Sequence, residues 1–95
     1  MADMYVDRNL ELMLDANALA GLLQEIFGTE MTTVPSQCAG CGNEAEVGSL
    51  LAFINGPGYV LRCSACKQVV LRIVQTPDAY IIDARGAAYL QLKRR

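Results

Sequence analysis

Four cysteines arranged as two Cys-x-x-Cys pairs constrain this chain more than any other feature. The sequence contains neither histidine nor a fifth cysteine, and 21 residues separate the two pairs. Each Cys-x-x-Cys turn directs two sulfurs toward one point, and Zn²⁺ binds four thiolates in a tetrahedron at about 2.3 Å each. We therefore predict that one Zn²⁺ is bound by the four cysteines, which are Cys38, Cys41, Cys63 and Cys66.

The full set of four thiolates favours a structural role for this metal. A catalytic zinc normally has three protein ligands and one open position, whereas four cysteines fill the tetrahedron. A pair of disulfides would instead require an oxidising compartment and an export signal. Residues 1–7 are acidic rather than basic, and the longest apolar run, residues 50–54, is too short to span a bilayer. We expect a cytoplasmic protein that does not act at a membrane.

The length of 95 residues indicates a single small domain. A chain of this size buries only about two thirds of the surface that its unfolded form exposes. Metal binding by the folded state alone would add to its stability. We expect an N-terminal extension at residues 1–14, a helix and zinc-ribbon domain at residues 15–92, and a basic end at residues 93–95.

An amphipathic helix is predicted over residues 16–27. Asp15 or Asn17 can cap its first turn, and Gly28 stands where a left-handed residue ends a helix. The apolar residues of this segment recur at helical spacing. They are Leu19, Leu22, Leu23, Ile26 and Phe27. This stripe either covers the sheet of the domain itself or forms a face for a partner. The periodicity of residues 1–14 fits a strand and a helix equally well.

The remainder of the chain reads as β-strands. Residues 68–75 are apolar on both faces, so the helix is expected to cover one of these faces. Residues 32–36 read as a link and residues 55–58 as a hairpin loop. The predicted strands span residues 46–54, 59–62, 68–75, 79–83 and 87–92. The sequence thus predicts an α+β fold, in which an N-terminal amphipathic helix packs on an antiparallel zinc-ribbon sheet of three to five strands.

The residues that follow the two cysteine turns differ in character. Gly42 tolerates the positive φ that such a turn commonly requires. Lys67 stands at the equivalent position, where a lysine costs backbone strain but places a positive charge near the thiolates. We expect both residues to adopt a left-handed conformation.

The charge of the chain favours a protein partner over nucleic acid. The formal net charge is −2, and four thiolates with one Zn²⁺ bring it to about −4. Residues 1–30 hold six acids against Arg8 alone, whereas residues 62–95 hold seven basic residues against two acids. We expect these acidic and basic regions to steer a protein partner or self-association.

The sequence offers no pairing of a nucleophile with a base. Ser36, Ser49 and Ser64 lack a neighbour that could activate them, and Glu44 and Glu46 fit an exposed strand better than an acid/base pair. We therefore expect a non-enzymatic zinc-binding adaptor. One alternative is a ribbon that binds nucleic acid or ribonucleoprotein through basic residues, namely Arg62, Lys67, Arg72, Lys93, Arg94 and Arg95. Another is a rubredoxin-like electron carrier, in which the same four thiolates bind iron.

Several strings resemble a small uncharacterised family of actinobacterial proteins whose cysteine pairs are similar to those of zinc ribbons. They are DANALAGLLQEIFG at residues 15–28, EMT at residues 30–32, CAGC at residues 38–41, VLRC at residues 60–63 and DARG at residues 83–86. The resemblance covers roughly residues 13–92. It implies a bacterial, cytoplasmic setting and no particular reaction, substrate or catalytic residue.

Overall fold

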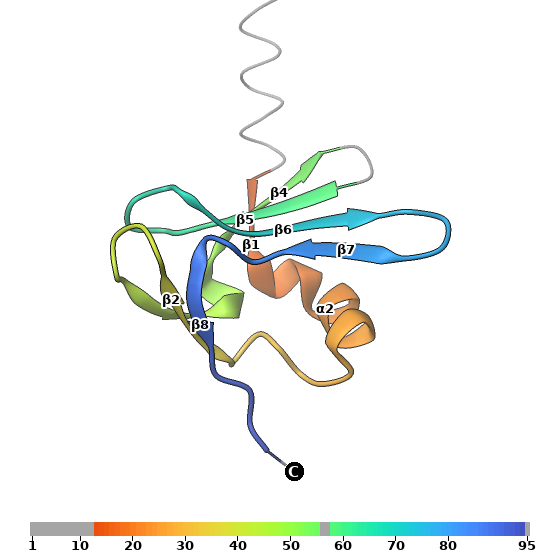
Figure 1. Cartoon of the computed structure of the whole chain (residues 1–95), viewed down its shortest axis with the longest axis horizontal. Helices are drawn as coiled ribbons and strands as arrows, with labels where there is room; N and C mark the ends of the chain where they lie inside the picture. The colour runs from red at the N-terminus through yellow and green to blue at the C-terminus, as the bar shows by residue number, and fades with distance from the viewer. Residues whose placement is uncertain (1–12, 56–57, 95) are drawn as a thin grey trace, which may run out of the picture.

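The described residues fold into two antiparallel sheets and one α-helix (Figure 1). The computed structural model describes residues 13–55 and 58–94. The elements are β1 (Met13–Asp15), the 3₁₀ helix η1 (Ala16–Leu19), α2 (Ala20–Phe27), β2 (Pro35–Cys38), β3 (Glu44–Glu46), the 3₁₀ helix η2 (Val47–Ser49), β4 (Leu51–Asn55), β5 (Gly58–Arg62), β6 (Val69–Gln75), β7 (Tyr80–Asp83) and β8 (Ala87–Leu90). The predicted α+β class is confirmed.

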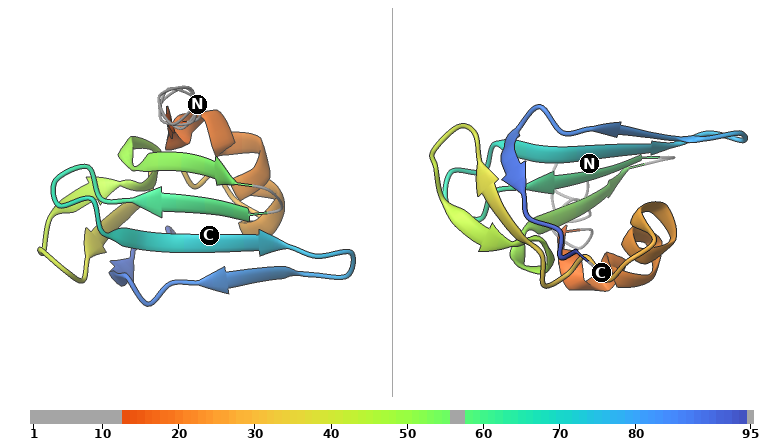
Figure 2. Two further views of the ribbon diagram at one scale, coloured as in Figure 1. Left: turned by 90° about the horizontal axis from the view of Figure 1, so that it is seen from above. Right: turned by 60° about the horizontal axis from the view of Figure 1, so that its bottom comes forward.

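The larger sheet has five strands in the order β1-β4-β5-β6-β7 and is antiparallel throughout. This number is the upper end of the predicted range. α2 lies against one face of the sheet, as the views of Figure 2 show. Leu23 of α2 is fully buried, together with Leu61, Leu71 and Ile73 of the sheet. The predicted packing of the helix on the sheet is therefore confirmed.

The predicted helix is present, but its first turn is tighter than expected. Residues 16–19 form a 3₁₀ turn, and α-helical geometry begins only at Ala20. Asp15 caps this turn, because its Oδ1 accepts a hydrogen bond of 2.9 Å from the N–H of Asn17. Gly28 ends α2 with a φ of 74°. Ala16 also donates its N–H to the carbonyl of Leu50 at 2.9 Å, which joins the turn to the segment just before β4.

The smaller sheet, with the order β3-β2-β8, was not predicted as a separate sheet. Its central strand β2 overlaps the segment that the sequence assigned to a link. Pro35 argued against a strand in the sequence, because proline lacks the N–H that a strand interior needs. Here it occupies the first position of β2, where that loss is tolerated. Its carbonyl still accepts a hydrogen bond of 2.9 Å from Gln91 N–H.

The single strand predicted over residues 46–54 is wrong. The segment divides into the end of β3, the turn η2 and most of β4, so the chain passes from the smaller sheet to the larger. Gly48 marks the crossing point and donates its N–H to the carbonyl of Thr32 at 2.8 Å. A Cβ at this position would lie 2.3 Å from Asn17 Oδ1 and 2.7 Å from Thr32 O, so only glycine fits.

The remaining predicted strands are confirmed to within two residues, as β5, β6, β7 and β8. Met13 and Leu14, which the sequence placed in the extension, pair with Phe53 and Ala52 as part of β1. The rest of that extension, residues 1–12, lies outside the described residues. Among the residues that are described, no helix combines the length and the apolar character needed to cross a bilayer.

Candidate metal centre

The two cysteine turns belong to different sheets. The first joins β2 to β3 of the smaller sheet, with Cys38 as the last residue of β2. The second joins β5 to β6 of the larger sheet, with Cys63 directly after β5. Both turns lie side by side at one end of the molecule in Figures 1 and 2. A metal held between them would therefore link the two sheets.

The backbones of the two turns have the same hydrogen-bond pattern. Cys38 and Cys63 each accept a hydrogen bond of 2.9 Å at the carbonyl, from the N–H of Gly42 and Lys67 respectively. Each of these two cysteines also donates its own N–H at 2.9 Å, to a carbonyl five residues further along the chain. The two turns therefore share one backbone hydrogen-bonding scheme.

The left-handed conformations predicted after the two turns are confirmed. Gly42 has a φ of 79° and Lys67 a φ of 69°, and among the described residues Lys67 is the one non-glycine with a positive φ. A left-handed conformation is costly for a residue with a Cβ. The Lys67 ammonium folds back over its own turn, where it donates to the carbonyl of Ser64 at 2.7 Å.

The four sulfurs converge on one point. All four Sγ atoms lie within 4.8 Å of one another. The Sγ atoms of Cys38 and Cys66 are 3.7 Å apart, as are those of Cys41 and Cys63. A tetrahedron with metal–sulfur bonds of about 2.3 Å has edges of about 3.8 Å. The thiols are free rather than joined in disulfides, and their arrangement fits a tetrahedral metal ion.

The site lies at the boundary between the core and the solvent. Cys38 and Cys63 are buried and belong to the hydrophobic core, with 4 % and 1 % of their surface exposed. Cys66 is half-buried and Cys41 is exposed. One cysteine of each pair is thus anchored in the core, and the other closes the site on the solvent side.

The pKa values of Cys41 and Cys63, whose Sγ atoms lie 3.7 Å apart, are shifted in opposite directions. Burial alone would raise the pKa of Cys63, but the N–H groups of Cys66 and Ala65 and the neighbouring thiols lower it to about 7. The N–H of Asn43 favours the thiolate of Cys41, yet desolvation and the three other thiols together raise its pKa to about 12. Because thiolates crowded together repel one another, four negative charges require a cation among them.

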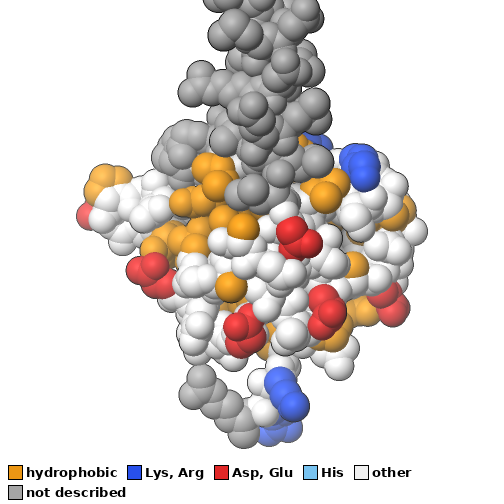
Figure 3. Space-filling model, turned by 180° about the vertical axis from the view of Figure 1, so that it is seen from behind, with side chains coloured by type: hydrophobic (Ala, Val, Ile, Leu, Met, Phe, Trp, Pro, Cys, Tyr) orange, Lys and Arg blue, Asp and Glu red, His pale blue; other side chains and the backbone are white. Residues whose placement is uncertain are grey.

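The five residues of the predicted partner face do not share one environment. Leu19 and Leu23 are buried in the core. Ile26 and Phe27 are half-buried and pack against that core, and Leu22 is half-buried. Figure 3 shows the molecule from behind, with a patch of hydrophobic side chains at the upper left of the described part. The large apolar side chains with the greatest exposure among the described residues lie elsewhere, at Ile81, Tyr89 and Leu92. None of these three is among the predicted partner residues, and no feature of the sequence separates the exposed Ile81 from the half-buried Ile82.

Several basic residues of the larger sheet have contacts within the chain, and Arg72 and Arg85 both lie near Asp83. Arg62 lies over the ring of Phe53, with its guanidinium carbon 5.7 Å from the ring centroid, and it donates to the carbonyl of Lys67 at 2.9 Å. Arg85 forms an ion pair of 2.6 Å with Asp83. On the face drawn in Figure 3, the basic side chains lie near the top and at the C-terminal end, with acidic side chains scattered between them.

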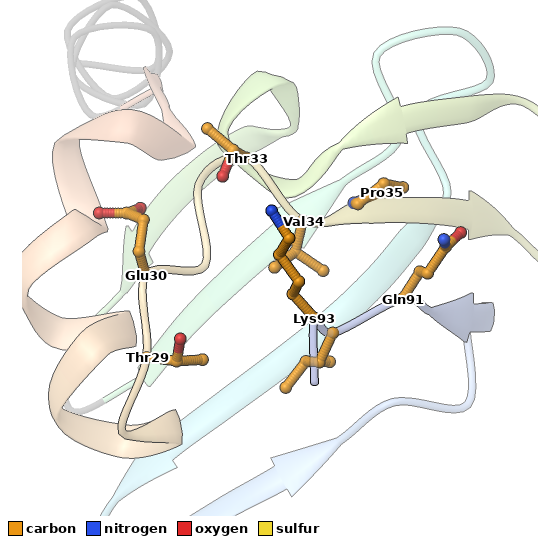
Figure 4. A pocket seen from close by; sticks show the side chains of 8 residues that line it. Thr29, Glu30, Thr33, Val34, Pro35, Gln91 and Lys93 are labelled. Carbon is orange, nitrogen blue, oxygen red and sulfur yellow. The ribbon is translucent and has the colours of Figure 1, made fainter. Parts of the chain in front are cut away.

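An open pocket of about 460 Å³ lies between the loop after α2 and the C-terminal segment (Figure 4). Glu30 and Lys93 are its charged residues. The Glu30 carboxylate accepts hydrogen bonds from the hydroxyl and the N–H of Thr32, and these lower its pKa. In Figure 4 the Glu30 carboxylate and the Lys93 ammonium point in different directions. The two charged groups of this pocket thus do not converge on a common ligand position.

Comparison with known proteins identifies the family of the chain. No curated protein and no solved structure matches it. A family model described as a family of unknown function matches residues 7–95. The match confirms the resemblance to an uncharacterised family, whereas actinobacterial origin and a relation to zinc ribbons stay predictions. It also includes most of the residues that the sequence analysis assigned to an extension. This chain therefore belongs to the family of unknown function DUF6510.

Proposed function

We propose that this protein is a non-enzymatic adaptor whose fold is held together by one structural Zn²⁺ at Cys38, Cys41, Cys63 and Cys66. The observation that carries the proposal is the convergence of the four Sγ atoms, with two opposing distances of 3.7 Å. These distances match the edge of a zinc–thiolate tetrahedron. The zinc would supply folding free energy and a fixed link between two sheets.

The chemistry of the ligand set supports a structural role. Four thiolates complete the coordination of zinc, so neither water nor a substrate would have a position on the metal. Zinc is preferred over iron because the chain offers few aromatic residues around the cysteine turns to shield a redox centre. Free thiols are the form maintained in a reducing cytoplasm, which is where we propose that the protein acts.

The adaptor role is supported by the surface. Three large apolar side chains, those of Ile81, Tyr89 and Leu92, are exposed at 56 %, 38 % and 42 %. The half-buried residues of α2 add to the apolar surface. Acidic residues dominate the first third of the chain and basic residues the last third. Such a surface suits contact with another protein better than binding to phosphate groups.

Affinity capture with the full chain as bait tests the adaptor role. Leu22→Asp places a charge on the half-buried face of α2, and Gln24→Asp is a matched control at an exposed position of the same helix. We expect wild type and Gln24→Asp to retain the same partner and Leu22→Asp to lose it. Thermal melts of both variants show whether the loss reflects binding rather than unfolding. Retention of no partner by the folded wild type would contradict the adaptor role.

The two alternatives derived from the sequence predict different results. A nucleic-acid ribbon would bind mixed oligonucleotides with an affinity that falls steeply as the salt concentration rises. A rubredoxin-like carrier would be red when oxidised, whereas the zinc protein is colourless. We expect no salt-dependent oligonucleotide binding and no visible absorption band.

A further inference from the structure

The open edge of the larger sheet runs along β7. This strand is last in the order of the sheet, and among the described strands only β6 pairs with it. Figure 2 (left) shows β7 at the lower border of the sheet. An edge strand presents N–H and C=O groups that can pair with a strand of another chain.

The register between β6 and β7 determines which backbone groups face outward. Thr76 donates its N–H to the carbonyl of Ala79 at 2.8 Å, at the start of this ladder. Hydrogen-bonded pairs alternate along an antiparallel ladder, so Ile81, two residues further, also bonds to β6. The N–H and C=O groups of Tyr80 and Ile82 therefore point away from β6, toward the open edge.

The side chains of β7 leave this edge accessible. Ile82 lies opposite the buried Ile73, so the next residue, Ile81, faces the side of the sheet away from the core. Ile81 is 56 % exposed. Neither lysine nor proline occurs within β7, and its register with β6 has no bulge. These are common means by which edge strands are kept from pairing.

The charges at the two ends of β7 are complementary to each other. Asp78 precedes the strand. Arg85 follows it and is ion-paired through Nη2 with Asp83 of its own chain, yet 89 % of its side chain is exposed and can also meet an acidic group of another chain. A second copy of the strand in antiparallel orientation brings each arginine close to the aspartate of the other chain. A parallel copy would bring like charges together. The edge is therefore self-complementary in the antiparallel orientation.

We propose that two copies of this protein pair through their β7 edges, antiparallel about a two-fold axis at Ile81. Tyr80 then exchanges backbone hydrogen bonds with Ile82 of the partner subunit, and the two Ile81 side chains meet at the axis. A pairing centred on Ile82 instead would require Ala84 of the partner subunit to bond to Tyr80, but the carbonyl of Ala84 already accepts a hydrogen bond from Ala87 at 3.0 Å. The pairing specifies one partner for the proposed interaction role and does not depend on the identity of the metal.

Sedimentation equilibrium of the full metal-loaded chain, over a series of concentrations, tests the pairing. We expect wild type to shift from monomer to dimer as its concentration rises. Ile81→Lys places two lysines opposite each other at the axis, with Cβ atoms about 5 Å apart, and replaces an apolar contact by like charges. It should raise the dissociation constant by at least about tenfold. Leu92→Lys, at another exposed apolar position outside β7, is the matched control and should dimerise like wild type.

Two further measurements examine the register. The amide hydrogens of Tyr80 and Ile82 should exchange with solvent more slowly at concentrations where the dimer forms. Asp78→Arg should weaken the dimer about threefold at low salt, because it sets two arginines side by side. A wild type that stays monomeric at all concentrations, equal effects of Ile81→Lys and Leu92→Lys, or no effect of Asp78→Arg would overturn the proposal. Metal content is measured on the same samples, so a monomer with one zinc per chain would overturn the pairing and leave the proposed metal site intact.

Discussion

At the residue scale, the positions that follow the two cysteine turns share a backbone conformation but not a side chain. Gly42 adopts its φ of 79° without strain, whereas Lys67 adopts a φ of 69° despite its Cβ. Lys67 therefore carries backbone strain, and its ammonium lies over the second turn, where it donates to the carbonyl of Ser64. The conformation is imposed by the hydrogen bond from each of these residues to the carbonyl of the first cysteine of its turn.

Substitutions at these two positions should therefore act in opposite directions. A Cβ at Gly42 would meet no other atom within 4 Å, so Gly42→Ala should cost about 1 kcal/mol of unfolding free energy through backbone strain alone. Lys67→Gly removes that strain and should leave stability unchanged or raise it by up to about 1 kcal/mol. Denaturant unfolding of both metal-loaded variants measures the difference. Equal destabilisation by both substitutions would contradict this explanation.

The pKa shifts of the cysteines predict how metal affinity depends on pH. The pKa of Cys63 in the folded chain, about 7, lies below its ordinary value of 9.0, so its contribution to stability is complete above pH 9 and is lost as the pH falls through 7. The pKa of Cys41, about 12, means that this thiol is protonated at neutral pH before the metal binds. Metal binding must then release protons.

The apparent affinity for Zn²⁺ should therefore rise as the pH is raised from 7 to 9. Competition with a chelator of known affinity, repeated at several pH values, measures this dependence. Proton release can be followed in the same titrations with a pH indicator in weak buffer. An affinity that does not change with pH would show that the thiols are not the ligands.

At the element scale, α2 derives its stability from one buried side. Leu23 is fully buried against the larger sheet, whereas its neighbour Leu22 is half-buried. Leu23→Ala should cost about 3 kcal/mol of unfolding free energy, because it leaves a cavity in the core. Leu22→Ala should cost about 1 kcal/mol or less. Urea unfolding curves of the two variants compare these costs, and similar midpoints would contradict the described orientation of α2.

The elements with strong periodicity could be predicted from the sequence. The helix repeat at Leu19, Leu23 and their neighbours, the glycine after Phe27 and the apolar alternation of β6 each reflect local physical constraints. The smaller sheet could not be predicted, because its strands β2 and β3 are short and polar. These strands are held by pairing partners distant in sequence, such as β8. The break at Gly48 likewise depends on contacts with Asn17 and Thr32 that only the folded chain brings together.

The four candidate metal ligands could be identified from the sequence alone, since their spacing and the absence of histidine and of further cysteines specify them. What could not be predicted is the location of the site between two sheets. That location depends on the separate sheet that contains Cys38, whose central strand β2 has no apolar alternation that would indicate a strand. The division of the helix stripe into buried and half-buried residues also required the folded structure.

At the scale of the whole molecule, the cysteine site joins two sheets that otherwise meet through a small core. β2 and β3 carry one pair of thiols and β5 and β6 the other. The buried Cys38 and Cys63 belong to the core on both sides of this junction. Loss of the metal should therefore separate the sheets and not merely loosen a surface turn. With zinc bound as proposed, the thermal stability of the whole chain would depend on one ion.

Elemental analysis of the purified full chain, combined with thermal melts before and after chelation, tests this account most directly. We predict one zinc per chain, a cooperative melt that collapses to a partly unfolded state when a chelator is added, and loss of both zinc and the melt in Cys63→Ser. Gln68→Ser, outside the ligand set but next to the second turn, should retain the zinc. Purified protein without stoichiometric metal, or a melt unchanged by chelation, would contradict the account.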